Sequence, residues 1–257
     1  MSVYYNDVDP FCCAVLRRQI ALGNLPPGDV DERDIRTVPA SDLTGYRQLH
    51  LFAGIGGIPL GLRWAGVPND FSIITGGFPC QPHSLAGKRQ ASADERDLWG
   101  EFARLVGELK PQWVLAENVP GLLSSEGGRF FGRVLRNLAA CGYDAEWDCI
   151  PAASVSAPHR RDRVFVVAYP NGIRPQARVL RRLLPPSPAN QGWQGQLARS
   201  SGNAVSRWGW TSETVFHRVA DGIPNRMERI RVLGNAVVPQ VVEYVGRCIL
   251  AAESEAA

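Results

Sequence analysis

Lysine is almost missing from this chain, and long apolar runs and paired cysteine motifs are missing altogether. Only two of the 28 basic residues are lysines, Lys88 and Lys110. Arginine presents a planar fork of donors that suits phosphate and guanine, although a GC-rich genome produces the same bias. The net charge of +3 is too small to indicate a polyanionic partner by itself. Composition therefore permits a nucleic-acid partner without requiring one.

No apolar run is long enough to cross a membrane, and the first ten residues, MSVYYNDVDP, contain no signal-peptide core. The six cysteines show neither metal-ligand spacing nor a disulfide framework. These absences predict a cytoplasmic protein with no metal and no membrane contact, and we expect a monomer. The length of 257 residues, 45% of them hydrophobic, fits one α/β domain with a small appendage.

Short apolar segments alternate with helical patterns, which favours an α/β fold with a mostly parallel sheet and helices on both faces. The expected strands are residues 2–5, a segment within 30–38, 48–53, 71–75, 112–117, 144–151 and 163–169. The expected helices are residues 10–22, 59–65, 97–110, 128–140 and 237–250. Residues 170–226 are rich in Pro, Gly, Arg and Trp with little periodicity, and residues 251–257 are expected to fray.

A cysteine stands at the tip of one expected strand. The apolar segment 71–75 is followed by GGFPCQPHS at 76–84. Ligands of open α/β sheets bind at the carboxyl ends of strands, and Pro79 and Pro82 stiffen the backbone around Cys80. Cys80 is a nucleophile if its thiolate is favoured, and otherwise a small buried hydrophobe, which is the usual fate of a free cysteine.

The segment GFPCQPHS resembles the catalytic motif of the DNA cytosine-5 methyltransferases, and other motifs occur in that family's order. They are LFAGIGG at 51–57, ENV at 117–119, the arginines of HRRDR at 159–163 and GNAV at 234–237. His50, His83 and His159 stand where the family usually has an acidic residue, Phe and Gln. The resemblance implies a short phage or bacterial member with a Rossmann-like, S-adenosylmethionine-dependent methyltransferase fold. Residues 1–169 and 227–250 would form the catalytic domain.

The resemblance implies that Cys80 adds to C6 of a flipped-out cytosine, after which C5 takes a methyl group from S-adenosylmethionine. Glu117 is expected to hold N3 of the ring. Arg163 is expected to contact O2, and Arg161 to position Glu117 or a phosphate. An acid at N3 and a cation at O2 would stabilise the charge that the attack places on the ring.

The donor's ribose normally needs an acidic residue about 20 residues after the glycines. Between Gly57 and Cys80 there is room for only one helix and one strand, and that strand leads to Cys80. Upstream, YNDVD at 5–9 resembles the family's ribose segment, and DI at 34–35 resembles the pair that meets adenine. We therefore predict a permuted order in which residues 1–45 lie beside the glycine turn; the alternative is an unrelated extension.

The expected donor-binding residues are Asp7, Val8, Asp34, Ile35, Phe52, Ala53, Gly54, Ile55, Gly56, Gly57, Pro79, Asn235 and Ala236. Double-stranded DNA is the expected partner, and the target base must be flipped because Cys80 cannot reach it inside a duplex. We expect residues 85–97 to form a lid and residues 170–226 to read the flanking sequence. The expected DNA-contacting residues are Gln81, Ser84, Lys88, Arg89, Arg96, Arg199 and Arg207.

Three other functions remain open from the sequence. One is a transfer-RNA cytosine methyltransferase of the same family, which would share every core motif. Another is a hydrolase that uses Cys80 and His83, although it leaves the glycine turn without a role. The third is a catalytically silent DNA-binding module, which the presence of Cys80, Glu117 and Arg163 argues against.

Overall fold

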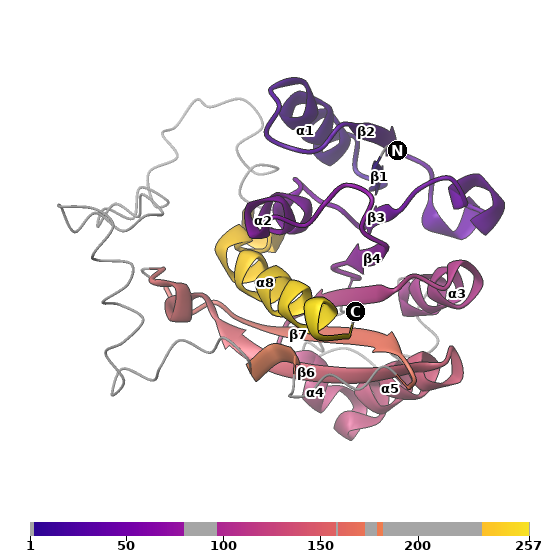
Figure 1. Ribbon diagram of the computed structural model, residues 1–257, viewed down its shortest axis with the longest axis vertical. Helices are drawn as coiled ribbons and strands as arrows, with labels where there is room; N and C mark the ends of the chain where they lie inside the picture. Colours follow the sequence, from indigo (N-terminus) through magenta and orange to yellow (C-terminus); the bar gives the residue numbers. More distant parts are fainter. Residues whose placement is uncertain (1–2, 80–96, 158, 173–178, 182–232, 257) are drawn as a thin grey trace, which may run out of the picture.

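Figure 1 shows the computed structural model, which describes residues 3–79, 97–157, 159–172, 179–181 and 233–256. These residues form a seven-stranded sheet with helices on both faces, which confirms the predicted α/β class. The strands are β1 (Val3–Asn6), β2 (Gly28–Asp31), β3 (Gln48–Leu51), β4 (Ile73–Gly76), β5 (Trp113–Asn118), β6 (Tyr143–Pro151) and β7 (Asp162–Pro170). The α-helices are α1 (Pro10–Ala21), α2 (Gly57–Ala65), α3 (Trp99–Leu109), α4 (Gly121–Ser124), α5 (Arg129–Ala140) and α8 (Pro239–Ala256). The short 3-10 helices are η1 (Ile35–Thr37), η2 (Ala40–Leu43), η4 (Ser125–Gly128), η5 (Ala152–Val155) and η6 (Val179–Arg181).

The order of strands in the sheet tests the predicted permutation. That order is β2-β1-β3-β4-β5-β7-β6, parallel from β2 to β5, with β7 antiparallel to both of its neighbours. β1 pairs with β3 through Tyr4 opposite Leu49 and Asn6 opposite Leu51. The N-terminal strands thus lie in the same sheet as the strand that leads into the glycine turn. The predicted placement is confirmed, and the alternative of an unrelated extension is wrong.

The sheet separates two apolar layers, because successive side chains of a strand point to opposite faces. Val114 of β5 packs in the layer that contains α3 and α5, whereas Trp113 and Leu115 pack in the layer that contains α2 and α8. Helix α1 covers β1 on the α2 side through Leu16. In Figure 1, α1, α2 and α8 accordingly lie on one side of the sheet and α3 and α5 on the other. No helix in the described ranges is long and apolar enough to span a membrane.

The N-terminal elements follow local sequence signals with one shift. Asp9 caps α1 by accepting a hydrogen bond from the Phe11 N–H at 2.9 Å, and Pro10 occupies the first turn, so the helix starts where predicted. β2 starts earlier than the predicted window of 30–38. Its later residues leave the sheet because the Asp34 side chain caps η1.

The predicted frayed tail from Ala251 is wrong for the residues that the structure describes. α8 continues to Ala256, and Ala252 is only 1% exposed within the core layer of α2 and α8. Glu253 accepts hydrogen bonds from the Trp113 indole at 2.7 Å and from the Gln112 amide. These contacts tie the last turns of α8 to the start of β5, and they could not be read from the short run of Ala, Ser and Glu.

His50 lies on β3 inside the sheet and is 1% exposed. Its Nε2 lies 3.3 Å from the Gln48 amide oxygen and its Nδ1 lies 2.8 Å from the Thr75 hydroxyl. An amide oxygen can only accept, so Nε2 carries the proton and Nδ1 accepts from Thr75. The histidine that replaces the family's usual acidic residue is therefore part of a buried polar network between β3 and β4.

This network predicts acid sensitivity of the fold. Burial lowers the pKa of His50 to about 3, whereas the unfolded side chain titrates near its usual value of 6.5. The unfolded state therefore binds the proton first, and stability is lost as pH falls from about 6.5 toward 3, by up to about 1.4 kcal/mol per pH unit. We expect chemical denaturation at pH 4 to 7.5 to show a shallower pH slope for His50→Gln than for the parent. Equal slopes would contradict this account of His50.

Candidate active site

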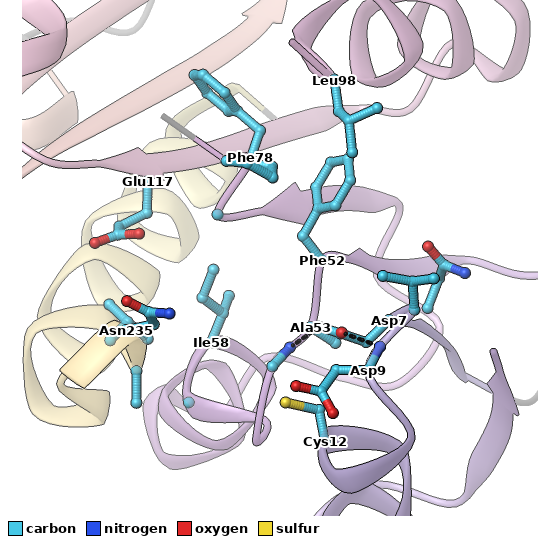
Figure 2. A pocket seen from close by; sticks show the side chains of 18 of the residues that line it. Asp7, Asp9, Cys12, Phe52, Ala53, Ile58, Phe78, Leu98, Glu117 and Asn235 are labelled. Carbon is cyan, nitrogen blue, oxygen red and sulfur yellow. Dashed lines mark hydrogen bonds between the residues drawn. The ribbon is translucent and has the colours of Figure 1, made fainter. Parts of the chain in front are cut away.

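The carboxyl ends of β1, β3, β4 and β5 meet around one cavity of about 710 Å³. Parallel strands place ligands at this edge of a sheet, where the connections on either side diverge. Figure 2 shows Glu117 and Asn235 toward one end of the cavity and Asp7, Asp9 and Cys12 toward the other. The lining residues include Asp7, Val8, Asp9, Cys12, Asp34, Ile35, Phe52, Ala53, Gly54, Ile55, Gly57, Ile58, Phe78, Pro79, Leu98, Glu117, Asn118, Arg163, Asn235, Ala236 and Val237.

Asp7, directly after β1, connects the N-terminal strand to the glycine turn at Gly54–Gly57. Its Oδ2 accepts a hydrogen bond from the Gly54 N–H at 2.7 Å, and its Oδ1 accepts from the Asp9 N–H at 2.9 Å. Both bonds are drawn in Figure 2. The predicted contact of Asp7 with the glycine turn is confirmed. Each carboxylate oxygen has two lone pairs, so Asp7 can hold the turn and still accept from ligand hydroxyls.

The glycine turn needs glycine for two different reasons. Gly54 and Gly56 have φ angles of +54° and +86°, which other residues adopt only with strain. A Cβ on Gly57 would lie 2.7 Å from Val237 Cγ1 and 2.8 Å from the Val237 carbonyl oxygen. The segment before α8 therefore sits directly on the first residue of α2. This close approach closes one wall of the cavity.

The end of the cavity where adenine is predicted to bind is lined by residues that follow β1, β2 and β3. Val8 lines the cavity and is 65% exposed, and Phe52 lines it from the end of β3. Ile35 also lines the cavity and is anchored in the α3 layer. Asp34 accepts hydrogen bonds from the Arg36 side chain, including one from Nε at 3.0 Å. A ligand amine at Asp34 would share that carboxylate with Arg36, a partner that sequence reasoning did not identify.

Glu117 lies at the other end of the cavity, at the tip of β5, and is 8% exposed. Burial raises the pKa of Glu117 to about 7, although Arg163 and Arg161 act in the opposite direction. Arg163 Nε lies 3.0 Å from Glu117 Oε1. A carboxyl group with this pKa can give or take a proton at neutral pH.

Arg161 and Arg163 make different contacts from those expected. Arg163, and not Arg161, forms the ion pair with Glu117. Arg161 Nη2 instead donates to the carbonyl oxygens of Gly234 and Ala236, both at 2.6 Å. Strand alternation would place the two side chains on one face, but only if the backbone were extended at both positions. Arg161 precedes β7 and has a left-handed φ of +36°, so strand alternation does not apply to it.

Asn118 is a site residue that the motif alone did not explain. Its side-chain amide donates to the Phe78 carbonyl oxygen at 3.0 Å, and both groups are buried. This bond fixes the end of β4 to the end of β5, two residues before Cys80. Sequence reasoning also missed Asp9, Cys12 and Leu98 as lining residues, because their contribution depends on how α1 and α3 pack beside the strand ends.

Several predicted site residues lie outside the described residues. Cys80 is the most important of them, and the structure reaches only to Pro79, which lines the cavity. The proposed lid falls largely in the same gap, and most of the proposed sequence reader falls in the gaps at 173–178 and 182–232. The remaining predicted residues in these gaps are Gln81, Ser84, Lys88, Arg89, Arg96, Arg199 and Arg207.

The cavity has the features that S-adenosylmethionine requires. A carboxylate at Asp7 can accept from ribose hydroxyls, and exposed apolar carbon of Val8 can cover one face of an adenine ring. The glycine turn brings backbone N–H groups close to a ligand. The residues therefore fit this donor. The described ranges contain no cluster of His, Cys, Asp and Glu that could hold a metal ion.

Comparison with known proteins places this site in a family. The profile of C-5 cytosine-specific DNA methylases matches residues 66–192, which begin just after the glycine turn and α2. The Type II methyltransferase M.PspPI of Psychrobacter sp. (strain TA137) is 33% identical over 65% of this chain and 33% of its own length. The Type II methyltransferase M.Eco47II of Escherichia coli is 33% identical over 67% of this chain and 35% of its own length. The matched region thus spans about a third of each relative.

Among solved structures, a putative DNA modification methyltransferase encoded within an Escherichia coli prophage is similar, with 23% identity and a TM-score of 0.47. The similarity covers 66% of this chain and 40% of that one, and at this TM-score it adds nothing to the assignment. The family profile and the two relatives show that this chain belongs to the C-5 cytosine-specific DNA methylase family.

Proposed function

We propose that this protein transfers a methyl group from S-adenosylmethionine to C5 of a flipped cytosine in double-stranded DNA. The observation that carries the proposal is the placement of Glu117 in one cavity with the glycine turn and Asp7. A proton-donating carboxyl group at one end and a ribose-type acid at the other match a reaction between a base and a nucleoside donor. The cytoplasm, where a bacterial or phage enzyme would meet DNA, is the proposed place of action.

In the proposed mechanism the thiolate of Cys80 forms a bond to C6 of the flipped base. The negative charge moves toward N3 and O2, where Glu117 supplies a proton to N3 and Arg163 stabilises O2. C5 then becomes nucleophilic toward the methyl group that S-adenosylmethionine would supply when bound, which would leave S-adenosylhomocysteine. Loss of the C5 proton to water, return of the N3 proton to the Glu117 carboxylate and departure of the Cys80 thiolate restore the aromatic ring and both catalytic groups. Burial of Glu117 favours its protonated form, which this role needs.

In this proposal the donor binds between residues that follow β1 and β3 and the segment that precedes α8. Asp7 would accept from the ribose hydroxyls, and Val8 and Phe52 would enclose the adenine. The turn from Ala53 to Gly57 would run beneath the rest of the donor, with Pro79, Asn235 and Ala236 completing the wall. These residues line the cavity together, except Gly56, whose N–H bonds to the Ala53 carbonyl inside the turn.

The donor site predicts a large effect of one N-terminal carboxylate. Charge-assisted hydrogen bonds are each worth roughly 1.5–3 kcal/mol, so Asp7→Ala should weaken S-adenosylhomocysteine binding by about one to two decades in calorimetric titration. DNA binding should be unchanged. Asp42→Ala is a suitable control, because Asp42 bonds Arg33 outside the cavity. Equal affinity of the Asp7→Ala variant and the parent would remove Asp7 from the donor site.

The substrate class is tested by expression in a methylation-deficient host followed by methylation-sensitive sequencing. New 5-methylcytosine at a defined sequence in DNA would support the proposal and reveal the recognition site. Incorporation of labelled methyl groups into transfer RNA instead of DNA would identify the RNA enzyme. Donor binding with no transfer to either nucleic acid would favour a catalytically silent module, and absence of donor binding would revive the hydrolase.

A further inference from the structure

We infer that Arg161 is a positioning residue that holds the Gly234–Ala236 segment in place and thereby links donor binding to the proton transfer at Glu117. This inference rests on the proposed function and assigns a different role from base or phosphate contact. It starts from the two hydrogen bonds that the Arg161 guanidinium gives to this segment.

The contact uses both N–H groups of one guanidinium nitrogen. One terminal nitrogen, Nη2, donates to two carbonyl oxygens at 2.6 Å each, and those carbonyls lie on either side of Asn235. A guanidinium nitrogen carries two N–H groups in one plane, so it can reach both carbonyls at once. The shape of the segment is thus fixed by one side chain from just before β7, more than seventy positions away in the sequence.

The backbone of Arg161 is adapted to this contact. Its φ of +36° lies in the left-handed region, which is unfavourable for a residue with a side chain. The neighbouring Arg160 carbonyl accepts from the Ala152 N–H at 2.7 Å, which fixes the chain just before the turn. Such strain persists only where surrounding contacts compensate for it, and the two carbonyl bonds are contacts that can do so.

The clamped segment is a wall of the donor cavity. Asn235, Ala236 and Val237 line it, and Val237 lies against Gly57 at the start of α2 so closely that no Cβ would fit there. A shift of the segment would therefore change the space around the glycine turn. The same guanidinium lies near enough to Glu117 for its charge to oppose the burial that raises the Glu117 pKa. One side chain thus acts both on the donor wall and on Glu117.

The first test measures donor binding by the full-length chain. The terminal nitrogen is one atom closer to the backbone in Lys and two atoms closer in Gln than Nη2 is in Arg, so neither should keep both carbonyl bonds. Arg161→Lys and Arg161→Gln should therefore each weaken S-adenosylhomocysteine binding by about tenfold or more in calorimetric titration. Arg160→Gln is the matched control, because the Arg160 side chain is 84% exposed. This variant should bind S-adenosylhomocysteine as tightly as the parent. Thermal unfolding without donor checks each variant for folding, and the Lys variant carries the test if the Gln variant does not fold.

The second test separates positioning from simple structural support. The charged groups that act on Glu117 in the described part of the chain are Arg163 and Arg161. Loss of one cation should raise the Glu117 pKa. The change in the single-turnover rate of methyl transfer that occurs near pH 7 should therefore shift to higher pH in Arg161→Gln. Arg161→Lys keeps a cation, so in this variant the change should stay near pH 7 although its donor affinity is reduced.

The outcomes distinguish this inference from the proposed function. Affinities within twofold of the parent in both variants would overturn the inference, and so would a loss confined to Arg161→Gln, because charge alone would then explain it. A parent protein that methylates DNA would leave the proposed function standing in either case. A parent that binds no S-adenosylhomocysteine would overturn both.

Discussion

Cys80→Ser is expected to abolish methyl transfer to DNA while S-adenosylhomocysteine binding is retained. A serine hydroxyl is almost fully protonated at neutral pH, whereas a cysteine has an accessible thiolate that is intrinsically nucleophilic toward carbon. Serine is close to cysteine in size and the substitution changes none of the described residues that line the cavity, so donor binding should be retained. Transfer is measured with a labelled methyl donor and duplex DNA, and donor binding by calorimetry.

A duplex that carries 5-fluorocytosine at the target position gives a second readout of the same prediction. Fluorine cannot leave C5 as a proton does, so the parent protein should remain covalently bound to the DNA and survive denaturing electrophoresis. The Cys80→Ser variant should form no such complex. Cys149→Ser is the matched control, because Cys149 is a free, exposed cysteine on β6 and its loss should change neither assay. Normal turnover by the Cys80→Ser variant would end the proposed mechanism.

The fold could be predicted from the sequence wherever a local pattern determined the element. The cap of α1 at Asp9 and the apolar stripe of α3 are local, and both helices lie where they were expected. The adjacency of β1 and β3 is not a local feature. It could still be inferred, because the chain between Gly57 and Cys80 is too short to hold a further strand that ends in the acidic residue needed for the ribose. Counting the available elements thus revealed the permuted order.

The sequence could not show which distant groups each polar side chain would meet. Arg161 and Arg163 share a motif, yet one bonds carbonyl oxygens before α8 and the other pairs with Glu117. The partners are tens of residues away, and a left-handed backbone at one position decides the direction of its side chain. The helical end of α8 was missed for a similar reason, since Glu253 is held by Trp113 of β5 and by Gln112 just before it.

The second large effect concerns Glu117, whose protonation is set by opposing influences. Burial raises its pKa and outweighs the two arginines, which leaves the pKa at about 7. Because this pKa lies above the usual value of 4.5, the folded state takes up a proton between these pH values. The stability contributed by the protonated group is therefore lost as pH rises through about 7. Glutamine does not ionise, so Glu117→Gln should be at least as stable as the parent at pH 8.

Glu117→Gln is nevertheless expected to lower the rate of methyl transfer by on the order of 10²-fold or more, because an amide can donate a hydrogen bond to N3 but cannot transfer a proton. The variant should also lose the pH dependence near 7 in single-turnover measurements, since the titrating group is gone. Donor affinity should be unchanged. Glu108→Gln, on the exposed side of α3, is the control that changes the same chemistry away from the cavity. A rate within twofold of the parent would show that Glu117 does not act on the base, whatever its pKa.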